Sequence, residues 1–210
     1  KWLGQSLSGL QVVWGYFLGM LITLVVIRLA GRGSLRTMMT TARLGLQLVR
    51  ALCLVGSLSM LFVSLHFLPL AEATAVSFVA PLLTVALAGP LLREQVGLAR
   101  WMAVLVGLAG ALLVLRPGTE LFRWVALLPF IGAFFFALFT IVTRRMHDED
   151  PITTLFYTSG GGAVFASIAV PWVWRTPTLT ELLVFLGFGA LGAMSHFGII
   201  QARSEEHTSE

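Results

Sequence analysis

The sequence predicts an all-α protein, a polytopic bundle of transmembrane helices, on three observations. Of its 210 residues, 57% are hydrophobic and only 11% are charged, whereas a soluble domain carries about 25% charged residues. The apolar residues gather in blocks close to the ~20 residues that a helix needs to cross the hydrocarbon core of a bilayer. None of these blocks shows the strict alternation of a membrane β-barrel strand.

Seven apolar blocks define the expected spans, and each is bounded by charge, proline or a short polar turn. In chain order they cover residues 9–29, 51–70, 73–92, 100–116, 123–143, 153–174 and 182–202. Pro81 lies near the middle of the third block, between Ser77 and Thr84. A proline removes a backbone hydrogen bond, so two interpretations stay open: a tolerated kink, or a break beside a solute path.

Basic residues separate the two ends of the expected spans. Nine lie at one side, in the connections after the first, third and fifth spans, and four lie at the other. The positive-inside rule therefore places the connection 28–50 in the cytoplasm. Because the bases occupy loops rather than a polar face, the net charge of +4 is explained without nucleic acid as a partner.

Small residues line one face of two expected spans. Gly56 and Ser59 share a face of the second, and Gly192 and Ser195 share a face of the last. Small residues let helices approach closely in lipid. The two pairs lie 136 residues apart, which hints at an internal repeat.

The stretch 68–118 carries a longer pattern. It contains Pro81, then Glu94 with Gly97, and it ends in Arg116-Pro117-Gly118. This pattern resembles the EamA-type repeat of the drug/metabolite transporter superfamily. The rest of the chain, from about residue 9 to 202, fits the family more loosely. Arg93 stands where the family usually has glycine. The family often has a basic residue in its second helix, which corresponds to the first span here, and Gly15, Tyr16 and Phe17 occupy that region.

The resemblance implies a ten-helix transporter made of two inverted five-helix repeats. On that plan residues 1–118 form the first repeat without its first helix, and residues 119–202 form the second repeat, truncated after its third helix. The ninth and tenth helices would be missing. We expect the polar segment 203–210 to be a non-native tail, with a solvated cytoplasmic tail as the alternative.

The function that the resemblance implies is secondary transport of small organic metabolites or drugs, as export or uptake, by alternating access. The expected location is a bacterial inner membrane, with the lipid bilayer and a small solute as partners and a homodimer left open. The alternative is a seven-helix receptor-like protein, or a non-transporting membrane protein or subunit. The only lysine is Lys1, so no span holds the lysine of a retinal protein.

Candidate site residues follow from two considerations. An ionisable side chain inside a span is costly and marks a cavity or a partner, and His66 and His196 are the expected proton-coupling residues of this kind. The resemblance further implies a central cavity, whose expected lining residues are Trp14, Ser59, Ser77, Pro81, Thr84, Tyr157, Ser195 and His196.

Enzymatic and metal chemistry are not expected from the motifs. Ser195 and His196 are adjacent, so on a helix they point about 100° apart and do not form a dyad. The single cysteine, Cys53, and the lack of an HExxH motif leave no metal site, catalytic residue or cofactor to predict. The run Gly160–Gly162 falls inside a span and is not a phosphate loop.

Overall fold

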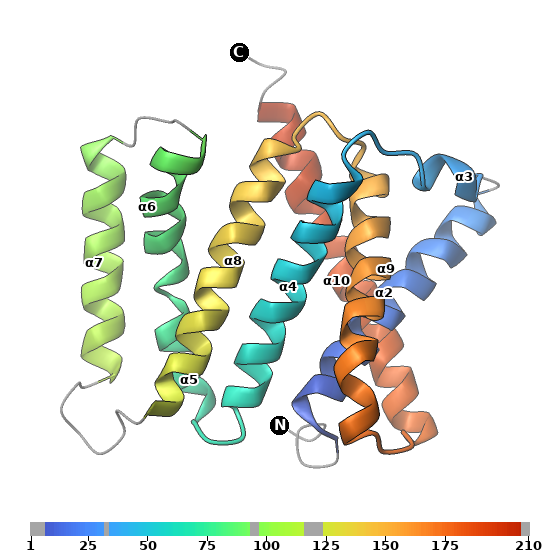
Figure 1. Ribbon diagram of the computed structural model, residues 1–210, viewed down its shortest axis with the longest axis horizontal. Coiled ribbons are helices and arrows are strands. Elements are labelled where there is room, and N and C mark those ends of the chain that lie inside the picture. The colour runs from blue at the N-terminus through green and yellow to red at the C-terminus, as the bar shows by residue number, and fades with distance from the viewer. Residues whose placement is uncertain (1–6, 32–33, 93–96, 116–123, 207–210) are drawn as a thin grey trace. The chain divides into compact units, whose positions relative to one another are not determined.

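The structure is a computed structural model that describes residues 7–31, 34–92, 97–115 and 124–206. Within these ranges all regular structure is helical (Figure 1). The α-helices are α2 Gly9–Ala30, α3 Leu35–Met38, α4 Leu44–Ser64, α5 Leu70–Ser77, α6 Ala80–Leu92, α7 Leu98–Leu115, α8 Leu127–Arg145, α9 Pro151–Ala169 and α10 Leu179–Glu206. Two 3-10 turns, Trp124–Ala126 and Val170–Val173, precede α8 and follow α9.

Six helical segments are long and apolar enough to cross a membrane. They are Gly9–Ala30, Leu44–Ser64, Leu70–Leu92, Trp124–Arg145, Pro151–Val173 and Leu179–His196, and a shorter apolar stretch covers Leu98–Gly110. Each predicted block therefore corresponds to a helix, and the prediction of a polytopic helical membrane protein is confirmed.

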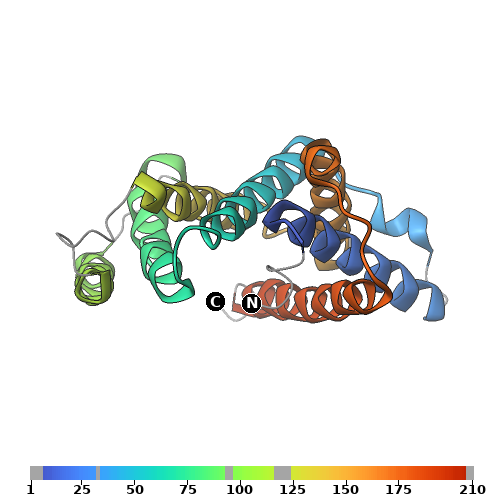
Figure 2. The ribbon, with the colours of Figure 1, turned by 90° about the horizontal axis from the view of Figure 1, so that it is seen from below.

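The chain forms two compact units. The first comprises Lys1–Val55 and Met146–Glu210, and the second comprises Gly56–Arg145, so α4 contributes its first half to one unit and its second half to the other. In the first unit α2 packs against both α9 and α10, and it lies between them in Figure 2. In the second unit α6 packs against α7 and α8.

Glycines set the distance between α2 and α10. A Cβ on Gly189 would collide with the backbone of Gly19, and a Cβ on Gly19 would collide with the carbonyl of Phe185. A Cβ on Gly192 would lie only 2.6 Å from Cε2 of Tyr16. The expected small face of the last helix is therefore used for close helix packing, where dispersion contacts between backbones hold helices together in lipid.

The start of α4 differs from the prediction. The segment 28–50 is not a loop, because α2 continues to Ala30, α3 lies within the connection, and α4 begins at Leu44 rather than at 51. The predicted block begins just after Arg50, but this arginine lies six residues after the start of the helix. Its guanidinium finds hydrogen-bond partners there, so the charge does not end the span.

The end of α4 also differs. The helix stops at Ser64, whose carbonyl accepts hydrogen bonds from the backbone N–H groups of Phe67 (3.0 Å) and Leu68 (2.8 Å) in the turn that follows. Pro69 disfavours helical geometry at the residue before it. His66 is consequently exposed in this turn, and the prediction that it lies inside a span is wrong.

Pro81 marks a break in the third span. The helix is interrupted at residues 78–79, between α5 and α6. Proline has no N–H to donate to the carbonyl of Ser77, four residues earlier, and it is tolerated in the first turn of a new helix. The two interpretations of Pro81 share this break, and whether a solute passes beside it stays a prediction.

The C-terminal part of the chain is helical beyond the predicted end of the last span. The backbone of α10 continues to Glu206, whereas residues 207–210 lie outside the described part, as do Glu94 and the connection 116–123. The origin of the segment 203–210 and the division into two repeats remain predictions.

Candidate functional site

The most deeply buried charged side chain in the described part of the first unit is Arg50. It is only 1% exposed, although α4 is one of the helices that could cross a membrane. An arginine inside a span is costly and usually faces a solute path, a cavity or a polar partner. The surroundings of Arg50 are therefore a candidate functional site.

Arg50 is bound to α9. Its Nη1 donates to the hydroxyl of Thr158 and to the backbone carbonyl of Thr154, the latter at 3.4 Å. One turn earlier on the same face of α4, Nε2 of Gln47 donates to Oγ1 of Thr154 at 3.4 Å. Because Thr154 and Thr158 are four residues apart, they share a face of α9. We name these four residues the Arg50 cluster.

Gln47 has one unpartnered polar atom. Its side chain is fully buried, and Oε1 has no hydrogen-bond partner among the described residues. In this orientation of the amide, Nε2 donates to Thr154 and the acceptor Oε1 is left without a partner. A buried polar atom without a partner costs about 1–3 kcal/mol, so this position favours a donor supplied from outside the chain.

His196 lies near the cluster, on α10. It is partly buried on α10, and the charge of Arg50 acts on its ring. Arg50 lies six residues after the start of α4 and Thr158 seven residues after the start of α9. At ~1.5 Å per residue both are about 10 Å inside these helix ends, which is well within the thickness of a span.

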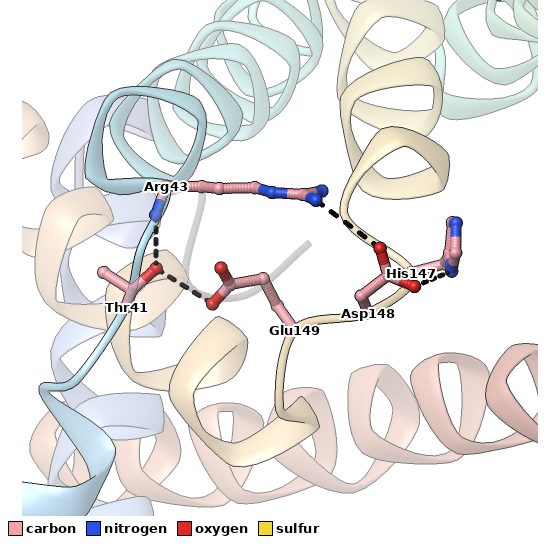
Figure 3. A network of polar contacts seen from close by, with 5 residues as sticks. All are labelled: Thr41, Arg43, His147, Asp148 and Glu149. Atoms are coloured by element: carbon pink, nitrogen blue, oxygen red, sulfur yellow. Dashed lines mark hydrogen bonds and ion pairs between the residues drawn. The ribbon is translucent and has the colours of Figure 1, made fainter.

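A polar network joins the connection before α4 to the turn before α9 (Figure 3). Nη2 of Arg43 lies 3.4 Å from Oδ2 of Asp148, and the hydroxyl of Thr41 donates to Oε2 of Glu149 at 2.9 Å. The backbone N–H of Arg43 donates to Oγ1 of Thr41 at 3.1 Å, and Nδ1 of His147 lies 2.6 Å from Oδ1 of Asp148. The side chains of Arg43 and Asp148 are 39% and 60% exposed, so this network lies at the surface.

The same connection covers the start of α9. The hydroxyl of Tyr157 donates to the carbonyl of Met39 at 2.8 Å, and Oγ1 of Thr153 donates to the carbonyl of Thr37 at 3.5 Å. Met38 is buried. We name the segment 34–43 the cover segment, since it lies over the start of α9. The Arg50 cluster lies about 10 Å further along this helix.

A pocket lies toward the other end of α9. It has a volume of about 460 Å³ and is lined by Trp14, Ser167, Val170, Pro171 and Trp174. Nε1 of Trp14 donates to Oγ of Ser167 at 3.0 Å, and the rings of Trp14 and Trp174 pack edge to face with centroids 5.4 Å apart. Tryptophans at a span end also serve as interfacial anchors, so the pocket by itself does not define a solute site.

Comparison with known proteins decides the family. The model of the EamA-like transporter family matches residues 1–116. The chain belongs to the EamA-like transporter family. This family and its named relatives make the chain a membrane transporter of small molecules, and they do not favour a receptor-like protein.

Two groups of relatives resemble this EamA-like transporter over most of its length. It is 30% identical to a protein of Rickettsia bellii named S-adenosylmethionine uptake transporter, over 97% of this chain and 69% of the relative. It is 29% identical to a protein of Vibrio cholerae named riboflavin transporter, over 80% of this chain and 58% of the relative. A riboflavin transporter of Rhizobium johnstonii is 27% identical over 94% of this chain and 66% of the relative. No solved structure matches.

The predicted lining residues of the EamA-like chain are divided between its two units. Trp14, Tyr157, Ser195 and His196 belong to the first, and Ser59, Ser77, Pro81 and Thr84 belong to the second. Within the first unit His196 lies near the Arg50 cluster. Trp14 contacts the far end of α9, the hydroxyl of Tyr157 bonds to the cover segment, and Ser195 is exposed.

Two of the predicted residues of the second unit bond to their own helices. The hydroxyl of Ser77 donates to the carbonyl of Ala73 at 2.9 Å, and that of Thr84 donates to the carbonyl of Ala80 at 2.8 Å. Ser59 is buried, whereas Pro81 is exposed. Hydroxyls bonded to their own helix are common in spans, so a role in solute binding for this group stays a prediction.

Sequence reasoning missed the Arg50 cluster. A detectable signal existed, because Gln47 and Arg50 are three residues apart among the apolar residues Leu44, Leu46 and Leu48. Thr154 and Thr158 likewise share a helix face. The first pair falls outside the predicted span 51–70, because an arginine is expected to end a span.

Proposed function

We propose that this EamA-like transporter moves a small organic solute by alternating access, and that the solute passes through the Arg50 cluster. The observation that carries the proposal is a guanidinium that is 1% exposed within a membrane-spanning helix. Charged residues in spans mark solute and ion pathways, and secondary transporters bind their solutes near the middle of the membrane.

The conformation supports a state in which the cluster is closed. A Cβ on Gly161 of α9 would lie only 2.9 Å from Cβ of Ala51 on α4, so these helices touch beside Arg50. Access would require α4 and α9 to part or the cover segment to move. The Arg43–Asp148 pair is suited to such a movement, because exposed ion pairs contribute only about 0–1 kcal/mol.

We propose that the cover segment faces the cytoplasm of a bacterium and acts as the inner gate. The excess of basic residues at this end supports the orientation, and the bacterial relatives support the inner membrane. The gate would open when the contacts of Arg43 and Thr41 with the turn before α9 break.

For the solute, S-adenosylmethionine is the first candidate. Relatives with this name match 97% of the chain, and an arginine fork suits a carboxylate. Riboflavin is the second candidate, supported by the pocket that Trp14 and Trp174 line, since indole rings suit a flat aromatic ring system.

His196 is proposed as a residue that couples transport to a proton. Its partly buried position on α10, close to the proposed solute path, supports this role. His66 is not proposed, because it lies in the exposed turn after α4.

Uptake into proteoliposomes tests the proposed function. Liposomes that contain the full-length protein should accumulate radiolabelled S-adenosylmethionine, or riboflavin in the second case, faster than empty liposomes. Arg50→Met should abolish most of this uptake, while Arg145→Met, at an exposed arginine at the end of α8, should retain it. Full uptake by a well-folded Arg50→Met protein would contradict a path through the cluster.

A further inference from the structure

We infer that Arg50 and Gln47 form a recognition site for an α-amino-acid group, with the carboxylate on the guanidinium and the ammonium on Oε1 of Gln47. This inference rests on the proposed function, in that the group belongs to the transported solute. It assigns a chemical class of ligand to two residues of α4 that lie one helical turn apart.

The guanidinium supplies the anion-binding half. It is planar and carries five N–H donors in a fixed fork. On α9 it donates to a hydroxyl and to a carbonyl oxygen, those of Thr158 and Thr154, which are neutral acceptors. A hydrogen bond to a carboxylate is about twice as strong as one to a neutral acceptor, and a carboxylate accepts two parallel bonds from the fork.

The buried oxygen of Gln47 supplies the other half. It is a hydrogen-bond acceptor whose partner is absent among the described residues, and an ammonium group carries three donors. A ligand N–H would remove the cost of this unpartnered atom. The unpartnered oxygen indicates, independently of the guanidinium, that the ligand has a hydrogen-bond donor as well as an anionic group.

The two halves converge on one residue. Nε2 of Gln47 bonds to Oγ1 of Thr154, and Nη1 of Arg50 bonds to the carbonyl of the same residue, each at 3.4 Å. The side chains of Gln47 and Arg50, both from α4, therefore lie beside each other against α9. An α-amino acid presents its carboxylate and its ammonium from a single carbon, which matches a donor and an acceptor placed side by side.

Other ligand classes satisfy only part of this arrangement. A cation without a carboxylate is repelled by Arg50, and an anion without an N–H or O–H leaves Oε1 of Gln47 without a donor. A neutral polyol could reach Gln47, but it would gain no charge-assisted bond from the guanidinium. The site therefore favours S-adenosylmethionine, which carries an α-amino-acid group, over riboflavin, which has none.

Binding to the purified full-length protein tests this inference separately from transport. The probes are S-adenosylmethionine, its decarboxylated analogue and its deaminated analogue, each titrated by microscale thermophoresis in detergent. We expect the wild-type protein to bind the decarboxylated analogue at least ~10-fold more weakly than S-adenosylmethionine, as the loss of a charged hydrogen bond implies. The deaminated analogue should also bind more weakly.

Two variants should separate the halves of the site. Arg50→Met should abolish discrimination against the decarboxylated analogue, and Gln47→Met should abolish discrimination against the deaminated analogue while keeping the other. Ser159→Ala is the matched control, since among the described residues this buried hydroxyl on α9 donates only to carbonyls of its own helix, those of Leu155 and Phe156. It should bind all probes as the wild type does.

The outcomes distinguish the inference from the proposed function. Equal binding of all three probes, no binding of S-adenosylmethionine, or unchanged discrimination in both variants would overturn the inference. Discrimination that follows Arg50 and Gln47 in a protein that transports neither candidate solute would support the binding site and overturn the transport role alone. If Arg50→Met does not fold, Gln47→Met still decides the question, because the ammonium contact has its own probe.

Discussion

The guanidinium of Arg50 on α4 donates a hydrogen bond to the hydroxyl of Thr158 on α9, so a charged side chain joins two membrane-spanning helices. A charge in a span needs good acceptors because lipid supplies none. The Arg50–Thr158 hydrogen bond affects both the stability of the protein and solute binding, and these two effects can be measured separately.

Removing the Thr158 acceptor should destabilise the first unit. Thr158→Val keeps the shape of the side chain and loses the oxygen, so the free energy of unfolding should fall by about 1–3 kcal/mol, the cost of a lost buried partner. Denaturant titration in mild detergent, followed by circular dichroism, measures this change. Ser159→Ala serves as the control and should lower the stability by less, since its hydroxyl bonds only to its own helix. Equal losses in both variants would contradict a special role of the Arg50–Thr158 bond.

The contact between α2 and α10 should be intolerant of any side chain at Gly189. Gly189→Ala places a methyl group against the backbone of Gly19, and overpacking of this kind costs typically 1–3 kcal/mol. Gly187→Ala, on the same helix, has no atom within 4 Å of the new methyl group and should be neutral or slightly stabilising, since alanine favours helix. Thermal unfolding of the two variants in one detergent gives the comparison, and a stable Gly189→Ala protein would argue against the packing described.

Breaking the Arg43–Asp148 pair should make the Arg50 cluster more accessible. Cys53, the only cysteine, is buried on α4 one turn after Arg50, and it provides a natural reporter of opening. Asp148→Ala should increase the rate at which a small maleimide alkylates Cys53, while the overall stability should change by no more than about 1 kcal/mol. The exchange of both charges, Arg43→Asp with Asp148→Arg, should restore slow alkylation. Alkylation rates that do not respond to either change would exclude the pair as part of a gate.

His196 and Ser77 should differ in their importance for transport. His196→Ala removes the partly buried ring that lies in the field of Arg50, whereas Ser77→Ala removes a hydroxyl bonded to its own helix. We expect uptake into proteoliposomes to fall more for His196→Ala. Uptake at wild-type level by both variants would remove His196 from the mechanism.

The orientation of the first unit can be tested with single cysteines in a Cys53→Ala background. Thr37 lies in the cover segment and Thr176 in the connection between α9 and α10, and both are exposed. In intact bacterial spheroplasts a membrane-impermeant maleimide should label Thr176→Cys, and it should label Thr37→Cys only after lysis. The reverse pattern would place the cover segment outside the cell.

The helices could be predicted because their cause is local. A backbone in lipid must satisfy its own hydrogen bonds, so an apolar block of sufficient length forms a helix wherever it occurs. The small face at Gly189 and Gly192 was readable for a similar reason, since small residues repeated on one helix face indicate close packing. The partner helix, α2, was not readable, because no property of α10 alone names its neighbour.

The site was harder to predict than the helices. Arg50 was treated as the end of a block because an arginine next to lipid is unfavourable, and that judgement depends on what surrounds the side chain. His66 falls within the predicted span 51–70, although the helix ends at Ser64. For Arg50 the polar partners of one side chain decided the outcome, and for His66 the early end of the helix before Pro69 decided it.

The sequence by itself determined that this protein is a helical membrane protein, where most of its spans lie, and which transporter family it resembles. These properties depend on hydropathy, segment length and local motifs, which act along the chain. Only the tertiary structure decided that Arg50, Gln47, Thr154 and Thr158 meet. The physical reason is that a buried charge is tolerated only where acceptors from another helix, about 100 residues away in the chain, are brought within hydrogen-bonding distance.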